Sequence, residues 1–150
     1  MNVSAATYVI RVKQPRTSTY FNLSNVQGFD FYVFLRDFVQ ERSAPHTDLG
    51  AKTVLRTEKL TSNVKLRTIE GIFESGVFGY ETEGRNAKTH KKSYTRTVDD
   101  AEMMPFFYMA QVPANSERAL LLIQRFGVFG VFSAFSRLLQ EKFKEVFPDL

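Results

Sequence analysis

The stretch Met104-Pro-Phe-Phe-Tyr-Met-Ala-Gln-Val-Pro113 begins the part of the chain that decides the fold. Its apolar run, 105–112, is followed by Pro113-Ala-Asn-Ser116 and then by a second apolar run at 119–124. Two short apolar runs separated by turn residues are typical of paired strands. This stretch therefore predicts two strands of one sheet.

A long amphipathic segment follows Gly127-Val-Phe-Gly130, and it predicts a C-terminal helix at about 130–147. Its apolar residues recur every three or four positions, the period of one helix face. They are Phe132, Phe135, Leu138, Leu139, Phe143 and Val146. Pro148 is expected to end the helix because proline cannot continue it. Strands followed by a helix indicate an α+β core.

Earlier segments add strands and a second helix to this prediction. Alternating apolar and polar residues indicate strands at 7–13, 53–57, 64–69 and 93–98, with a turn at 61–63 joining the second and third of them. Asp30 is a suitable N-cap for a helix at about 30–42, although a strand over 29–35 fits the same residues. We expect a mostly antiparallel, twisted sheet of about five to seven strands, packed against both helices.

Composition favours a single domain. The 150 residues include 15 Phe, no Trp and no Cys, so disulfides, thiolate metal sites and cysteine nucleophiles are excluded. Residues 1–7 lack the pattern of a signal peptide, and no apolar run approaches the ~18 residues of a membrane span. We expect a cytoplasmic domain without membrane contact, either complete at 1–150 or the N-terminal domain of a longer protein.

Positive charge is concentrated in the first two thirds of the chain. Residues 1–98 contain 15 Lys and Arg against nine Asp and Glu, whereas residues 99–150 contain five against seven. Such asymmetry is expected of a protein that binds a polyanion, and also of an ordinary basic protein with a solvated surface.

The segment 85–96 is the strongest candidate binding site. It contains five cations and no acid, with a histidine and a tyrosine between them: Arg85, Lys88, His90, Lys91, Lys92, Tyr94 and Arg96. Cations beside an aromatic ring can bind phosphates and stack a base, so we predict a non-catalytic domain that binds nucleic acid, in particular RNA. Further cations at 11–16 and 65–67 would widen the patch if their strands are neighbours. The alternative is a solvated hairpin whose lysines block edge pairing.

Acidic residues give a second, weaker hypothesis. Glu70, Glu74, Glu81 and Glu83 lie in one glycine-rich region and could bind a divalent ion, as in a metal-dependent nuclease. The usual acid and Glu-x-Lys spacing of such enzymes is missing, and neither histidine belongs to a metal-binding pattern. No Ser-His-Asp, Gly-x-Ser-x-Gly or Walker pattern occurs either. The sequence predicts no catalytic residue, metal or cofactor.

The aromatic residues and the glycine turn leave two further alternatives. The phenylalanines of 106–107 and 126–135 are expected in the core, but an exposed stripe of them would indicate a protein-interaction or oligomerisation domain. The Gly127–Gly130 turn is expected to be a tight bend. It could instead place backbone amides at a helix start to bind an anion.

The segments Met104–Pro113 and Arg118–Arg125, with the Gly127–Gly130 turn and its helix, resemble uncharacterised bacterial proteins from phage-defence and mobile-element regions. The resemblance covers residues 104–147 and contains no catalytic motif. It implies a bacterial cytoplasmic setting and an N-terminal recognition domain of a larger effector. It assigns no functional residue.

Overall fold

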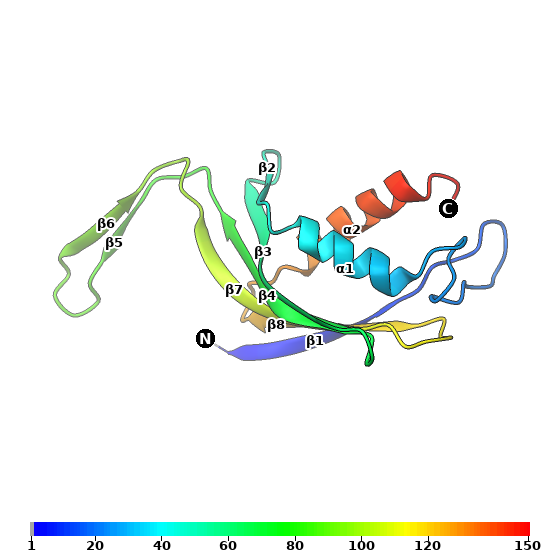
Figure 1. Ribbon diagram of the computed structural model, residues 1–150. Coiled ribbons are helices and arrows are strands. Elements are labelled where there is room, and N and C mark those ends of the chain that lie inside the picture. The colour runs from blue at the N-terminus through cyan, green and yellow to red at the C-terminus, as the bar shows by residue number, and fades with distance from the viewer. Residues whose placement is uncertain (1) are drawn as a thin grey trace.

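The computed structural model describes residues 2–150. Within these residues, two helices and eight strands follow one another (Figure 1). In order they are β1 (Val3–Ile10), α1 (Phe31–Glu41), β2 (His46–Asp48), β3 (Thr53–Asn63), β4 (Thr68–Val77), β5 (Thr82–Arg85), β6 (Lys92–Arg96), β7 (Glu102–Gln111), β8 (Ala119–Phe126) and α2 (Phe132–Val146).

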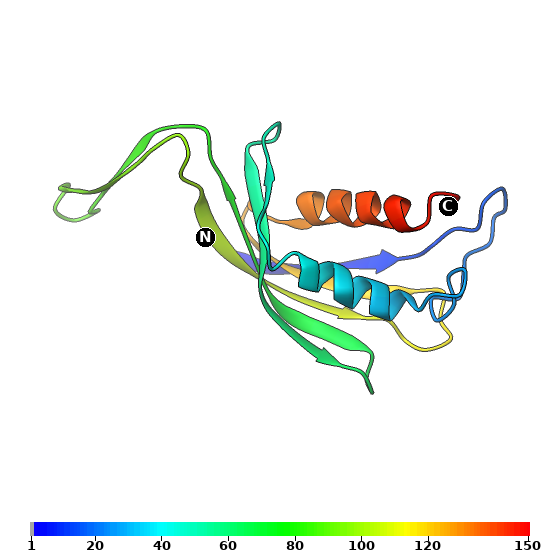
Figure 2. The same ribbon diagram turned by 45° about the horizontal axis from the view of Figure 1, so that its top comes forward.

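Six strands form one curved antiparallel sheet in the order β1-β8-β7-β4-β3-β2. The other two, β5 and β6, form a separate ribbon that extends away from the sheet (Figure 1). Both helices lie on the same face of the sheet, side by side (Figure 2). The predicted α+β class, the antiparallel sheet of five to seven strands and the C-terminal helix are confirmed.

Helix α1 begins where the sequence predicted it, and the alternative strand at 29–35 is wrong. The Asp30 carboxylate accepts a hydrogen bond from the Tyr32 amide at 3.0 Å, which satisfies one of the free N–H groups at the helix start. Phe31, Leu35 and Phe38 lie on one face of the helix and are buried. This periodic burial, with a capped start, explains why the segment is helical.

Aromatic rings fill the layer between the helices and the sheet. The Phe135 ring of α2 lies 5.7 Å from that of Phe38 on α1 and 5.2 Å from that of Phe73 on β4. Phe73 in turn stacks on Tyr108 of β7 at 3.9 Å. Each buried ring contributes about 1.5–3 kcal/mol through the removal of apolar surface from water. The phenylalanine-rich composition therefore serves mainly to join the two layers.

One turn differs from the prediction. Strand β3 continues through 61–63, and the chain reverses at 64–67, so Val64 and Leu66 are exposed turn residues. The Asn63 side chain accepts a hydrogen bond from the Leu66 amide at 3.0 Å, and Arg67 takes a positive φ of 54°. The apolar alternation of this segment resembles a strand, but Asn63 stabilises a turn at 64–67, three residues later than predicted.

Within residues 2–150, neither helix is long and apolar enough to cross a membrane.

Candidate functional site

The β5–β6 ribbon has a well-defined local structure. Its strands pair from Thr82 with Arg96 to Arg85 with Lys92, with a bulge between Gly84 and Arg85. In the turn, the Asn86 side chain accepts hydrogen bonds from the amides of Lys88 and Thr89, each at 2.9 Å. Asparagine commonly stabilises turns in this way. The ribbon therefore presents residues 86–91 at a tip far from the sheet (Figure 1).

Two lysines at the tip are the free cations of the ribbon. Lys88 and Lys91 are exposed, and neither forms an ion pair with any of residues 2–150. His90 between them has a positive φ of 60°, and its carbonyl accepts a hydrogen bond from Arg85. The sequence prediction of an exposed, cationic turn matches this placement.

A neighbouring acid partly neutralises the other cations of the strands. The Glu83 carboxylate lies 2.9 Å from Arg85 and 3.6 Å from the Lys92 ammonium across the ribbon. Both pairs are solvent-exposed, so each contributes little to stability and is weakened by salt. A phosphate group could compete for either cation. The positive potential of the ribbon is nevertheless lower than the count of basic residues suggests.

Arg96, by contrast, does not belong to the exposed surface. Only 5% of it is accessible, and its guanidinium lies 3.9 Å from the centre of the Tyr80 ring. Its Nη1 donates weakly to the Glu102 carboxylate at 3.4 Å and to the Val77 carbonyl at 3.5 Å. It anchors the base of the ribbon to the sheet.

Tyr94 is half exposed on β6, with 51% of its surface accessible. Its ring covers Gly84 on the opposite strand, where a Cβ atom would overlap the ring. Its hydroxyl group lies 3.3 Å from the Glu102 carboxylate. The half-exposed ring lies on the same ribbon as the free lysines, nearer the base than the tip, and offers a surface on which to stack a base.

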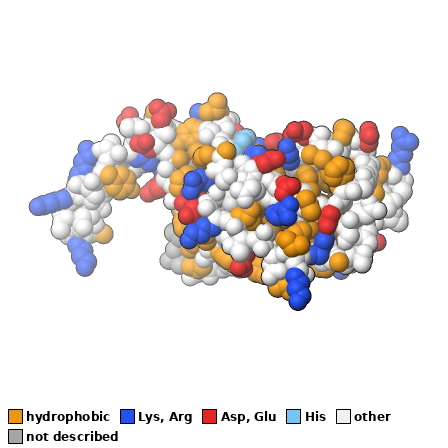
Figure 3. All heavy atoms as spheres, viewed as in Figure 1, with side chains coloured by type: hydrophobic (Ala, Val, Ile, Leu, Met, Phe, Trp, Pro, Cys, Tyr) orange, Lys and Arg blue, Asp and Glu red, His pale blue; other side chains and the backbone are white. Residues whose placement is uncertain are grey.

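The remaining basic residues do not extend the ribbon surface. Strands β1 and β3 are not neighbours, and the chain after β1 lies at the opposite end of the molecule from the ribbon (Figure 1). The Arg67 guanidinium is held by the Asp30 carboxylate through hydrogen bonds of 2.7 and 2.8 Å. In Figure 3, cations gather at the ribbon end, whereas over the body they are interspersed with acids.

The predicted metal-binding carboxylates do not form a cluster. Within residues 2–150, no group of three His, Asp or Glu residues is placed to hold a metal ion. Glu74 pairs with Arg56 at 2.7 Å, and Glu83 is held by the ribbon cations. His46 begins the short edge strand β2 and pairs with Leu55. The geometry gives the nuclease hypothesis no support.

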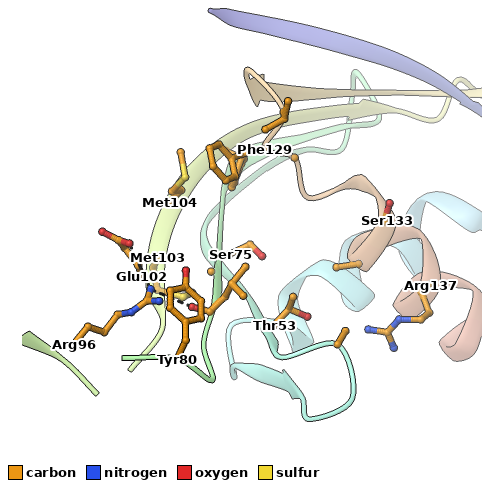
Figure 4. Close-up of a pocket in the computed structure, with 17 residues that line it drawn as sticks. Thr53, Ser75, Tyr80, Arg96, Glu102, Met103, Met104, Phe129, Ser133 and Arg137 are labelled. Carbon is orange, nitrogen blue, oxygen red and sulfur yellow. Dashed lines mark hydrogen bonds and ion pairs between the residues drawn. The ribbon is translucent and has the colours of Figure 1, made fainter. Parts of the chain in front are cut away.

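A cavity of about 790 Å³ lies between the sheet and the start of α2, and no sequence pattern indicated it (Figure 4). The residues labelled there come from distant segments: Tyr80 and Arg96 on one side, and Ser133 and Arg137 of α2 on the other. Arg137 is held by Asp48 at 2.8 Å. A hydrogen bond from the Ala51 amide, assisted by the nearby Arg137 charge, lowers the pKa of the Asp48 carboxyl group.

No protein-family model matches this chain, and neither a curated protein nor a solved structure is significantly similar to it.

Proposed function

We propose that this domain is a non-catalytic nucleic-acid-binding module that uses the β5–β6 ribbon to hold RNA. The observation that carries the proposal is the projection of the ribbon tip, with Lys88 and Lys91 free of ion pairs, on a ribbon that also carries the half-exposed Tyr94 ring nearer its base. Lysines supply phosphate contacts, whereas the tyrosine ring supplies a stacking surface.

Single-stranded RNA suits this arrangement better than a regular duplex. The deep, narrow major groove of an A-form helix does not admit side chains that could read the bases, whereas unpaired bases can stack on aromatic rings. The ribbon offers one such ring and a small number of cations on a narrow support. We therefore expect modest affinity and little sequence preference, with strong dependence on salt.

The test is fluorescence anisotropy with a short single-stranded RNA at several salt concentrations. In the variant Lys88→Glu/Lys91→Glu, the loss of two phosphate contacts should reduce the slope of log K against log salt by about 1.4, at ~0.7 per contact. The matched control is Lys13→Glu/Lys65→Glu, which makes the same charge change at exposed positions outside the ribbon.

The two variants separate a ribbon site from general attraction to a basic protein. Weaker binding in the ribbon variant alone would support the proposal. An equal loss in both variants would show that net charge alone drives binding, and unchanged binding in the ribbon variant would exclude the ribbon. The Tyr94→Leu variant should weaken binding while leaving the salt slope unchanged, because it removes stacking but no phosphate contact.

A second candidate function is self-association through the outer face of the sheet, which neither helix covers (Figure 1). Apolar side chains form a stripe across this face in directly opposed pairs: Ile72 with Phe107, Met109 with Leu122, and Leu120 with Val9. Two copies could bury the same stripe against each other in an isologous sheet-on-sheet contact. Light scattering tests this candidate, because a monomer at high concentration would refute it. Association with a bacterial defence effector remains a prediction.

A further inference from the structure

The start of α2 has backbone amides without a cap, and they belong to residues that line the cavity. The N-cap residue, Val131, has no side chain that can accept a hydrogen bond, and the first turn contains no acid. Within residues 2–150, the amides of Ser133 and Ala134 have no side-chain cap and no loop carbonyl as partner. Both residues line the cavity, together with Gly130 of the preceding turn. Uncapped amides at a helix start attract anions.

A second and independent feature of the same cavity is the unsatisfied guanidinium of Arg96. Its Nε and Nη2 atoms are buried without a hydrogen-bond partner among residues 2–150. Its two contacts through Nη1, at 3.4 and 3.5 Å, are long for a charged donor. A buried cation with unused donors is costly unless something else accepts from it. Figure 4 shows its side chain reaching from β6 toward Tyr80 and Glu102 at the cavity edge.

The remaining lining is largely apolar. Met103, Met104, Phe106, Val128 and Phe129 lie between the two polar ends, and Glu102, the one acid among the lining residues, already contacts Arg96. The volume of about 790 Å³ is in the range of small-molecule sites. A free inorganic anion would leave most of this apolar surface in water, so the lining favours a ligand with an apolar body.

We propose that this cavity binds a small molecule with an apolar body and an acceptor group at each end, at least one of them a carboxylate or phosphate. The acidic group accepts hydrogen bonds from the Ser133 and Ala134 amides at the start of α2. The group at the other end accepts from Arg96, which Tyr80 covers. Because the Nε and Nη2 atoms of Arg96 are covered in the structure, the proposal requires the half-exposed Tyr80 ring, in the link between β4 and β5, to move aside when the ligand binds.

The experiment is isothermal titration of the full chain with three probes of one length: decanedioate, decanoate and 1-decanol. We expect decanedioate to bind with one-to-one stoichiometry and at least about fivefold more tightly than decanoate, and 1-decanol to bind weakest. No saturable binding of any probe would overturn the proposal. Equal affinity for decanedioate and decanoate would overturn the assignment of Arg96 as the residue that binds the second end of the ligand.

The decisive variant is Ser133→Glu, which places an acid in the first turn of α2. It should raise the thermal midpoint, because an acid is favourable there, and abolish decanedioate binding by occupying the anion site. The matched control is Ser136→Glu, one turn further along α2 and outside the lining of this cavity, which should retain binding. Equal loss in both variants, or retained binding in Ser133→Glu, would refute the site.

Arg96→Met tests the second end of the cavity site, and the double lysine variant separates this site from the RNA surface. In Arg96→Met, decanedioate should bind only as tightly as decanoate does, and the affinity for decanoate should not change. If that variant does not fold, Ser133→Glu with the three probes still decides the question. Lys88→Glu/Lys91→Glu should bind decanedioate as the wild type does, so failure of the RNA proposal would leave this one standing.

Discussion

Replacement of Asp30 tests how the first helix is attached to the sheet, because one carboxylate makes two kinds of contact. It caps α1 by accepting a hydrogen bond from the Tyr32 amide at 3.0 Å. It also accepts two hydrogen bonds from the Arg67 guanidinium, at 2.7 and 2.8 Å. Arg67 lies in the β3–β4 turn, and its Nε donates to the Val112 carbonyl at 2.7 Å. Asp30 thus joins the helix start to the ends of three strands.

Two substitutions separate these contacts. Asp30→Asn keeps the cap, because asparagine caps as well as aspartate, and loses the charge. Two hydrogen bonds between charged groups would be worth about 1.5–3 kcal/mol each if fully buried. With side-chain exposures of 30% for Asp30 and 18% for Arg67, solvent screening reduces the loss to about 1–2 kcal/mol in total. Asp30→Ala also loses the cap, which adds about 1 kcal/mol.

Urea denaturation followed by circular dichroism measures both losses. The midpoints should fall in the order wild type, Asp30→Asn, Asp30→Ala, with the slope of the free energy of unfolding against urea unchanged. Equal midpoints for Asp30→Asn and wild type would show that the ion pair is energetically neutral. Equal midpoints for the two variants would show that the cap contributes nothing.

Because of the same ion pair, we expect the free energy of unfolding to depend on pH. Hydrogen bonds from Arg67 hold the pKa of the Asp30 carboxyl group below its usual value in the folded protein. A group with a lowered folded pKa stabilises the protein fully above its unfolded pKa, about 3.9, and loses that contribution as pH falls through the folded pKa. Wild type should therefore converge on Asp30→Asn in acid. A constant difference between them down to pH 2 would contradict the assignment.

Three further substitutions test the core and the ribbon. Phe135→Ala should lower the free energy of unfolding by about 3–5 kcal/mol, because its ring packs between Phe38 and Phe73; a loss below about 1 kcal/mol would refute that packing. Gly71→Ala should cost about 1–3 kcal/mol or prevent folding, because its Cβ atom would overlap the Lys59 carbonyl on the neighbouring strand; wild-type stability would show that the strands can separate there. Gly84→Ala should speed amide exchange in β5 and β6 while changing global stability by less than about 0.5 kcal/mol, since it displaces the Tyr94 ring on an isolated ribbon.

The sequence predicted the helices and most strands because their signals are local. The three-to-four-residue period of 132–146 and the cap at Asp30 each specify a helix without reference to the rest of the chain. The turn after β3 was misplaced because Val64 and Leu66 alternate with polar residues as a strand would. Only the side-chain hydrogen bond of Asn63 and the placement of Arg67 against Asp30 set the turn, and that placement depends on tertiary contacts.

From the sequence, the candidate site could be predicted only where one continuous segment contains all the residues involved. The turn and its cations could be read from residues 85–92, but the pairing of Glu83 with Lys92 depends on strand register. Arg96 is buried against Tyr80, and these two residues lie sixteen positions apart in the sequence. The cavity could not be predicted at all, because its walls come from five separate parts of the chain.

Arg96 also explains how a two-stranded ribbon can hold a fixed direction. Such a ribbon is only marginally stable alone, so its orientation must come from contacts at its base. There the guanidinium lies against Tyr80, and the Gly79 amide donates to the Val98 carbonyl at 2.8 Å. The base is thus fixed while Lys88 and Lys91 remain free in water. Because the same arginine lines the cavity, Arg96→Met should weaken both RNA and decanedioate binding, whereas Ser133→Glu should affect decanedioate alone.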